Sequence, residues 1–294
     1  MDRMLSRKAT IAAFVLPGLL IFCVVYVFPI FYTLRLSVTD WEGLGPMNFV
    51  GQANYVKLFL RDKVFLTSVK NVFTVVAFGL VAQLIPALSL ALALGYLRNK
   101  IRFYRNAFFI PVLMSASAVG IMWCEFYDVN HGALNALLGF VGLQGWSRDW
   151  LSDKATTLVA VILPAVWQWL GYHLILLYSS VRGIPDQYME AARIDGCNAL
   201  QTVWHVLLPL MRDPIKVSVV LATVGCLKYF DIVYVMTGGG PYNLTSTIAL
   251  QMYKESFLKL QFGYGSTIAV VLCALCILVF VLINKLLTRE AITY

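Results

Sequence analysis

The chain has 294 residues, of which 60% are hydrophobic and only 13% are charged, and its mean hydropathy is +0.76. A soluble domain carries about 25% charged residues, so this composition excludes a protein whose whole surface faces water and indicates an integral membrane protein. The formal net charge is +8. Because the cations lie between apolar runs and not in one cluster, we attribute them to membrane topology and expect no nucleic-acid partner.

Six apolar runs are long enough to cross a bilayer. A transmembrane helix needs about 20 mostly apolar residues, and the stretches between charged residues predict spans at 9–34, 71–97, 106–124, 155–181, 214–235 and 262–284. The first run follows a basic N-terminus, as in a signal peptide, but it is too long and no small-residue cleavage site follows. We therefore predict an all-α membrane protein, with residues 1–294 forming one transmembrane domain and the first span uncleaved.

Lysine and arginine in the short loops predict the orientation, since cytoplasmic loops are enriched in them. Placing the N-terminus inside puts these cations on the cytoplasmic side: Arg3, Arg7, Lys8, Arg98, Lys100, Arg102, Arg105, Arg182, Arg193, Arg212, Lys216, Lys285 and Arg289. The long loop after the first span is an exception, with cations outside at Arg35, Lys57, Arg61, Lys63 and Lys70. We expect both termini, and the loop 182–212, to face the cytoplasm.

The loop 182–212 predicts two short helices joined by a turn. Pro185 and Asp186 favour a helix start near Ile184, and Gly196 can end that helix. A second helix can begin after Asn198.

The second helix is expected to be interrupted at Pro209. Its apolar residues fall at helical spacing and predict one continuous face formed by Leu200, Val203, Trp204, Leu207 and Leu208. On residue chemistry alone, this segment is a well-ordered loop with ordinary helix formers and caps.

The stretch EAARIDGCNALQTVWHVLLP, residues 190–209, resembles the EAA loop of binding-protein-dependent ABC importer permeases. The matching positions are Glu190, Ala191, Ala192, Gly196, Val206, Leu208 and Pro209. Cys197 and Val203 depart mildly from the usual residues. In that family the loop is a coupling helix that enters a groove of a cytoplasmic ATPase. The resemblance implies ATPase docking by Met189, Glu190, Ala191, Ala192, Asp195 and Gly196.

Two further stretches, FVGQANYVKLF (49–59) and FDIVYVMTGGGPYNLTST (230–247), look like segments of the carbohydrate permeases related to the maltose and glycerol-3-phosphate systems. The resemblance covers most of the chain. It implies a bacterial or archaeal plasma membrane protein that imports a sugar, oligosaccharide or polyol. It also implies as partners a second related permease chain, two ATPase subunits and an extracellular solute-binding protein.

The sequence lacks a phosphate-binding G-x-x-x-x-G-K-[ST] motif. We therefore expect no ATP hydrolysis by this chain, so that ATP and magnesium bind the partner ATPase and this chain holds no cofactor. The three histidines are scattered, and Cys273 and Cys276 form a C-x-x-C inside an apolar run without a second ligand pair. We expect neither a catalytic nor a metal site.

Polar and aromatic residues near the middles of the spans are the candidates for a substrate path, because polar groups avoid lipid. They are Gln83, Ser115, Trp167, Gln168, Tyr172, Lys228, Tyr229 and Asp231. Lys228 and Asp231 lie three residues apart in the predicted fifth helix, where they can pair. The structural alternative is that the amides bond helix to helix and the aromatics only pack.

Two other functions are compatible with a polytopic membrane protein. A secondary transporter is expected to show inverted repeats, broken helices and membrane-embedded acids, and Asp231 is the one candidate acid of that kind. A membrane scaffold or assembly factor is the third possibility. The EAA resemblance favours the importer over both.

Overall fold

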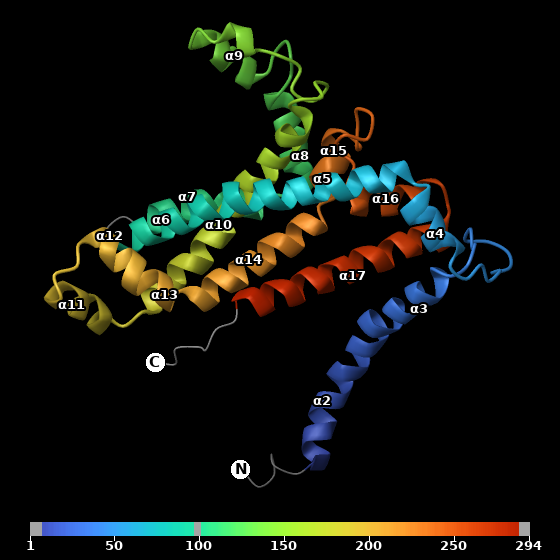
Figure 1. Ribbon diagram of the computed structural model, residues 1–294, viewed down its shortest axis with the longest axis horizontal. Helices are drawn as coiled ribbons and strands as arrows, with labels where there is room; N and C mark the ends of the chain where they lie inside the picture. Colours follow the sequence, from blue (N-terminus) through green and yellow to red (C-terminus); the bar gives the residue numbers. More distant parts are fainter. Residues whose placement is uncertain (1–7, 97–100, 288–294) are drawn as a thin grey trace. The chain divides into compact units, whose positions relative to one another are not determined.

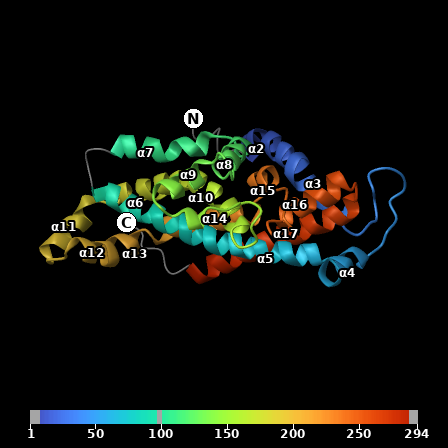
Figure 2. The ribbon, with the colours of Figure 1, turned by 90° about the horizontal axis from the view of Figure 1, so that it is seen from above.

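A computed structural model of the chain describes residues 8–96 and 101–287 (Figures 1 and 2). In this part of the chain the regular structure is helical, apart from an isolated antiparallel bridge between Thr39 and Phe49. The chain divides into two compact units. The first comprises the described residues up to Asp62 together with Met252–Cys273, and the second comprises Lys63–Gln251 together with the described residues from Ala274 onward.

Five stretches of the described residues are long and apolar enough to cross a membrane: Ile11–Leu36, Lys63–Gly95, Thr157–Gly183, Arg212–Met236 and Phe262–Leu287. The fourth of them is interrupted between Leu227 and Asp231. A sixth candidate span is a pair of shorter helices, Phe103–Leu113 and Ala116–Phe126, bent by 98° at the break between them. The predicted all-α membrane fold with six spans is thus confirmed when this pair is counted as one span. The third span is not the straight helix that residues 106–124 predicted.

The first unit joins the N-terminal span and the loop after it to the start of the last span. Its elements are α2 (Lys8–Phe22), η1 (Cys23–Val27), α3 (Phe28–Leu36), α4 (Ala53–Leu60), η6 (Lys254–Leu258) and the first part of α17 (Phe262–Leu287). Thr267 donates to the carbonyl of Ser37 at 2.8 Å. A Cβ at Gly263 would lie 2.1 Å from the carbonyl oxygen of Thr39, so glycine is needed where α17 meets the loop.

The second unit surrounds the long helix α10 (Thr157–Gly183), which contacts α5, α6, α7, α8, α14 and α15. Its other elements are α5 (Lys63–Gly79), η2 (Leu80–Leu84), α6 (Ile85–Tyr96), α7 (Ile101–Phe109), η3 (Ile110–Leu113), α8 (Ala116–Phe126), α9 (Ala133–Phe140), η4 (Gln144–Trp146), α11 (Asp186–Ile194), α12 (Ala199–Thr202), η5 (Val203–Leu207), α13 (Leu208–Leu210), α14 (Arg212–Leu227), α15 (Asp231–Met236) and the start of α16 (Ile248–Tyr253). Small residues allow α6 to lie close to α10, where Ala87 and Ala91 pack with Leu174 and Leu177.

Three turns of π-helix precede three of the prolines. They are η1 before Pro29, η2 before Pro86 and η5 before Pro209. Proline lacks an N–H and its ring meets the carbonyl four residues back, so a wider turn relieves the conflict without ending the helix. As a result residues Ala199–Leu210 form one helix that passes Pro209 by one residue, so the predicted interruption lies at Leu210 and not at the proline itself.

Gly171 fixes the contact between α10 and the broken third span. A Cβ at Gly171 would lie 1.8 Å from the carbonyl oxygen of Phe108, a backbone atom that cannot move aside alone. We therefore expect Gly171→Ala to destabilise the protein by about 1–3 kcal/mol, the usual cost of overpacking. The measurement is the midpoint of thermal unfolding of the purified protein in detergent.

Gly225→Ala in α14 is the matched control, because a Cβ there meets no atom within 4 Å and alanine favours a helix over glycine. It should leave the midpoint unchanged or raise it. If the unfolding midpoint fell equally in the two variants, the close approach of the Phe108 carbonyl to Gly171 would be contradicted.

Candidate functional site

The helix α11 has the predicted boundaries, to within two residues. Pro185 caps its start and Asp186 occupies its first turn, where the positive end of the helix dipole favours a carboxylate. Gly196 has a φ of +78°, and the N–H of Cys197 donates to the carbonyl of Ala192 at 2.9 Å. These are the features of a glycine-terminated helix, so the prediction that Gly196 ends α11 is confirmed.

The second helix of the loop begins after Asn198, as predicted. The side-chain oxygen of Asn198 accepts from the N–H of Gln201, and the side chain of Gln201 accepts from the N–H of Asn198, both at 2.8 Å. This capping box satisfies two N–H groups that a helix start leaves unpaired. The turn between α11 and α12 is therefore fixed by local chemistry on both sides.

One face of α11 is open. Ala192 is the buried residue of this helix, whereas Gln187, Glu190, Ala191 and Ile194 are exposed at the i, i+3, i+4, i+7 spacing of a single face. Ile194 is 86% exposed. The small side chain of Ala191 lets another surface approach the helix closely, beside the carboxylate of Glu190.

The predicted continuous apolar face of the second helix was wrong. Leu207 is buried, but Leu200 and Trp204 are 67% and 63% exposed. The cause is the π-turn η5, which adds one residue to a single turn of the helix. This rotates the residues after it relative to those before it, so positions that an α-helix would align are separated. Leu200 and Trp204 therefore add to the exposed apolar surface that begins at Ile194.

Behind α11 lies a hollow of about 650 Å³ whose lining includes Met189, Arg182 and Arg193. Asp195 and Gly196 are exposed at the turn. The six residues that the EAA resemblance assigns to docking thus fall on one short helix and its terminal turn, with Ala192 packed inward and Met189 half-buried.

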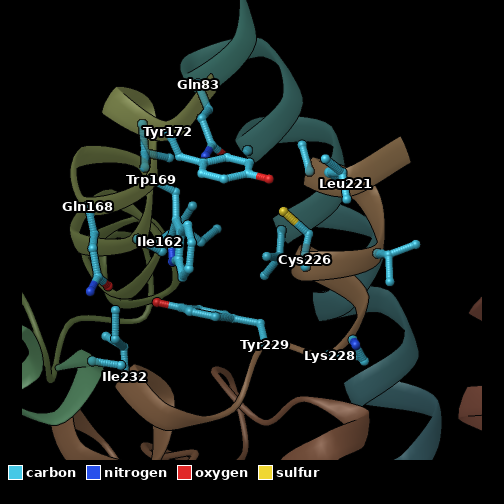
Figure 3. A pocket seen from close by; sticks show the side chains of 18 of the residues that line it. Gln83, Ile162, Gln168, Trp169, Tyr172, Leu221, Cys226, Lys228, Tyr229 and Ile232 are labelled. Atoms are coloured by element: carbon cyan, nitrogen blue, oxygen red, sulfur yellow. The ribbon is translucent and has the colours of Figure 1, made fainter. Parts of the chain in front are cut away.

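A second candidate site is a cavity of about 390 Å³ between the helices α5, α10, α14 and α15 (Figure 3). Six of the predicted path residues line it: Gln83, Gln168, Tyr172, Lys228, Tyr229 and Asp231. In Figure 3 the ring of Tyr172 extends from α10 into the space beside Gln83. Aromatic rings, amides and charges from separate helices thus meet in one space.

Ser115 and Trp167 do not line this cavity. Ser115 caps α8, where its hydroxyl oxygen accepts from the N–H of Ala118 at 3.2 Å. Trp167 lies on another face of α10, with its ring centre 6.1 Å from that of Trp123. Ser115 and Trp167 were predicted from their depth, near the middle of a span. Depth does not distinguish one face of a helix from another.

The residues missed on α10 follow a helical period. Ile162, Val166, Trp169 and His173 all line the cavity, at the i, i+4, i+7, i+11 spacing of one face. Trp169 lies three residues from Tyr172, on a neighbouring face of the helix, whereas Trp167 lies five residues away. Helical periodicity would therefore have selected Trp169 in place of Trp167.

Several cavity residues bond helix to helix. The amide nitrogen of Gln168 donates to the carbonyl of Met114 at 2.9 Å, and the hydroxyl of Tyr229 donates to the carbonyl of Val161 at 2.7 Å. His173 and Ser218 lie 2.7 Å apart, between Nδ1 and the hydroxyl oxygen. Gln168 and Tyr229 thus have a structural role whether or not they meet a substrate, and the rings of Trp169 and Tyr172 pack against each other with their centres 6.1 Å apart.

Lys228 and Asp231, which the sequence left free to pair, do not pair in the structure. Helix α14 ends at Leu227 and α15 begins at Asp231, with Phe230 at a φ of −138°. The break removes the helical i, i+3 geometry, and no ion pair joins the two side chains in the described chain. Both are exposed residues of the cavity wall. Elsewhere in residues 8–96 and 101–287, no group of three potential metal ligands occurs.

The profile of the family described as "Binding-protein-dependent transport system inner membrane component" matches residues 67–292. The chain is 35% identical over 88% of its length to the probable ABC transporter permease protein YurN of Bacillus subtilis, covering 89% of that protein. It is 34% identical over 96% of its length to the diacetylchitobiose uptake system permease protein NgcF of Streptomyces coelicolor, covering 84% of it.

The fold is similar to that of a solved chain from a bacterial alginate ABC transporter in complex with an alginate pentasaccharide-bound periplasmic protein. The TM-score is 0.85 at 17% identity, with 99% of both chains covered. The profile match spans most of the chain, and the similarity to YurN and NgcF is high over nearly the whole length. The chain belongs to the family of inner membrane components of binding-protein-dependent transport systems, the permease subunits of ABC transporters.

Proposed function

We propose that this chain is the permease subunit of an importer that moves a sugar, oligosaccharide or polyol into the cytoplasm. The observation that carries the proposal is the continuity of α10. This helix forms one wall of the cavity at Trp169 and Tyr172 and runs unbroken to Gly183, at the edge of the α11 loop. Tyr172 and Gly183 are separated by roughly 16 Å along the helix at about 1.5 Å per residue.

The chemistry of the cavity supports a carbohydrate. Sugars present hydroxyl groups and an apolar ring face, which suit the amide of Gln83 and the rings of Trp169 and Tyr172. The relatives point the same way, since NgcF is named for diacetylchitobiose uptake and the solved transporter imports alginate. The second permease chain would supply the opposite wall.

The open face of α11 supports docking of an ATPase. A cytoplasmic loop that leaves Ile194, Leu200 and Trp204 exposed carries an apolar surface that another protein can cover. Each of two permease chains would dock one ATPase subunit, and those subunits would bind ATP and magnesium. This requires the loop and both termini to lie in the cytoplasm.

In the proposed cycle, a loaded solute-binding protein docks on the extracellular loops and ATP closes the ATPase dimer. The α11 loop follows that closure and shifts the end of α10, so that the cavity opens outward to receive the solute. Hydrolysis returns the helices to the inward-open arrangement.

A change on the open face of α11 should impair assembly with the ATPase without impairing insertion of this chain into the membrane. We expect Glu190→Lys to leave the amount of protein in the membrane unchanged but to reduce copurification of the ATPase, and uptake with it, by at least about tenfold. The reason is that the exposed carboxylate at the centre of the open face becomes a cation. Gly196→Asp should act similarly by straining a turn at a φ of +78°.

Glu125→Lys is the matched control, because Glu125 is also exposed and lies outside the loop. The Glu125→Lys variant should copurify with the ATPase and transport the sugar as the wild type does. Normal ATPase recovery with Glu190→Lys would count against docking at α11, and purification of the wild type without any ATPase would remove the importer proposal itself.

The cavity is tested by two tryptophans separated by two positions. We expect Trp169→Ala to raise the KM for uptake about threefold to tenfold, the effect of losing one aromatic contact to a ring. Trp167→Ala should leave the KM close to that of the wild type, since Trp167 does not line the cavity. The measurement is uptake of the radiolabelled sugar by vesicles holding the complete transporter. Equal KM values for the two variants would contradict the proposal that substrate passes through this cavity.

A further inference from the structure

The wall of the 390 Å³ cavity carries two charges of opposite sign. Among the described residues that line it, Lys228 and Asp231 are the charged ones, and both are exposed. No ion pair joins either side chain to another described residue. Both lie in a membrane-spanning segment, where a charged group is costly and marks a substrate path. The two side chains therefore need a role in the cavity.

The other polar side chains of the cavity offer less surface to a substrate. Gln83, Gln168 and His173 are 5%, 2% and 3% exposed, and the last two already bond to other segments of the chain. Tyr172 is 36% exposed. The accessible polar chemistry of this wall is therefore an ammonium and a carboxylate, with one phenol beside them.

The break between α14 and α15 keeps the two charges apart. Helix α14 ends at Leu227 and α15 begins at Asp231. Within the break, the hydroxyl of Tyr229 donates to the carbonyl of Val161 at 2.7 Å, and the carbonyl of Tyr229 accepts from Thr247 at 2.7 Å. Because Tyr229 is anchored at its side chain and at its backbone, the residues on either side of it keep their positions in the cavity wall.

The two charged groups complement hydroxyl groups. An ammonium donates hydrogen bonds and cannot accept them, whereas a carboxylate accepts and cannot donate. A hydroxyl does both, so one hydroxyl can accept from Lys228 while another donates to Asp231. A sugar or polyol thus satisfies both groups without a charge of its own. The ring face of a sugar also suits Trp169 and Tyr172, which line the same cavity.

A substrate with one net charge meets an opposing charge on this wall, whichever sign it carries. A carboxylate or phosphate is attracted by Lys228 and repelled by Asp231, and for an ammonium group the two are reversed. Such interactions are stronger inside a protein than in water, because the local dielectric is low. Like charges brought together are a means of rejecting a wrong ligand. The pair therefore disfavours uronic acids, sugar phosphates and amino sugars alike.

We propose that Lys228 and Asp231 are specificity-determining residues that select an uncharged, hydroxyl-rich substrate. One hydroxyl accepts from the Lys228 ammonium, and another donates to the Asp231 carboxylate. This inference rests on the proposed function and narrows its substrate class.

The test measures binding to the complete transporter in mild detergent, without a solute-binding protein, so that selection by that protein does not enter. The probes are methyl glucoside, glucuronate and glucosamine, which share a sugar ring and differ in charge. Saturation-transfer NMR reports the binding of each. We expect the wild type to bind the neutral probe at least about fivefold more tightly than either charged one, the effect of one like-charge contact.

Two variants that each remove one charge should shift this preference in opposite directions. Lys228→Gln leaves the carboxylate alone and should favour glucosamine over glucuronate by about fivefold or more. Asp231→Asn leaves the ammonium alone and should favour glucuronate over glucosamine to a similar extent. A merely structural role would lower the binding of all three probes together.

Lys70→Gln is the matched control, because Lys70 is an exposed lysine of α5 that does not line the cavity. It should keep the order of the wild type. Equal binding of the three probes by the wild type overturns the inference, as does a shift in the same direction in both variants. Tighter binding of glycine betaine than of methyl glucoside also overturns it, since a zwitterion would then satisfy the pair.

Uptake by vesicles that hold the complete transporter and its solute-binding protein separates this inference from the proposed function. If a radiolabelled sugar is taken up but none of the three probes binds the wild type, or the variants leave the charge preference unchanged, only the selection by Lys228 and Asp231 fails. If no sugar is taken up at all, the proposed function fails.

Discussion

The structure of this protein depends on one constraint: in a bilayer, every backbone polar group has to find a partner within the protein. Unbroken helices meet it by themselves, and each break needs a side chain. The amide of Gln168 donates to the carbonyl of Met114 where the third span bends, and Thr247 donates at 2.7 Å to the carbonyl of Tyr229 where α14 gives way to α15. At the prolines the same requirement is met by π-turns, which keep η2 and η5 within continuous helices.

This constraint explains which parts of the fold the sequence could predict. Apolar length is an average over about twenty residues, so the spans were found. The break at Ser115 and the break between Lys228 and Asp231 depend on partners far along the chain, such as Gln168 and Thr247, which no local pattern contains. Leu200 and Trp204 were misplaced because a π-turn changes the helical period that the prediction assumed.

The same division holds for the candidate sites. The end of α11 and the start of α12 could be predicted because Gly196 and Asn198 act on neighbours within a few residues. The cavity is a meeting of several helices, and depth alone could not tell Trp169 from Trp167. Functional assignment of the loop rested on resemblance, since residue chemistry by itself described no more than a well-capped pair of helices.

These sites are linked through α10, which presents a different face to each of them. Ile162, Val166 and Trp169 face the cavity. Val159 and Leu163 line a separate pocket with Trp123 and Trp150, the aromatic pocket, about 70° away around the helix at roughly 3.6 residues per turn. Gly171 and Gln168 also hold the broken third span against this helix. Because close-packed helices move as units and do not deform continuously, a displacement of α10 at Gly183 carries α8 with it. A motion that begins at the α11 loop therefore reaches the walls of both the cavity and the aromatic pocket through one rigid element.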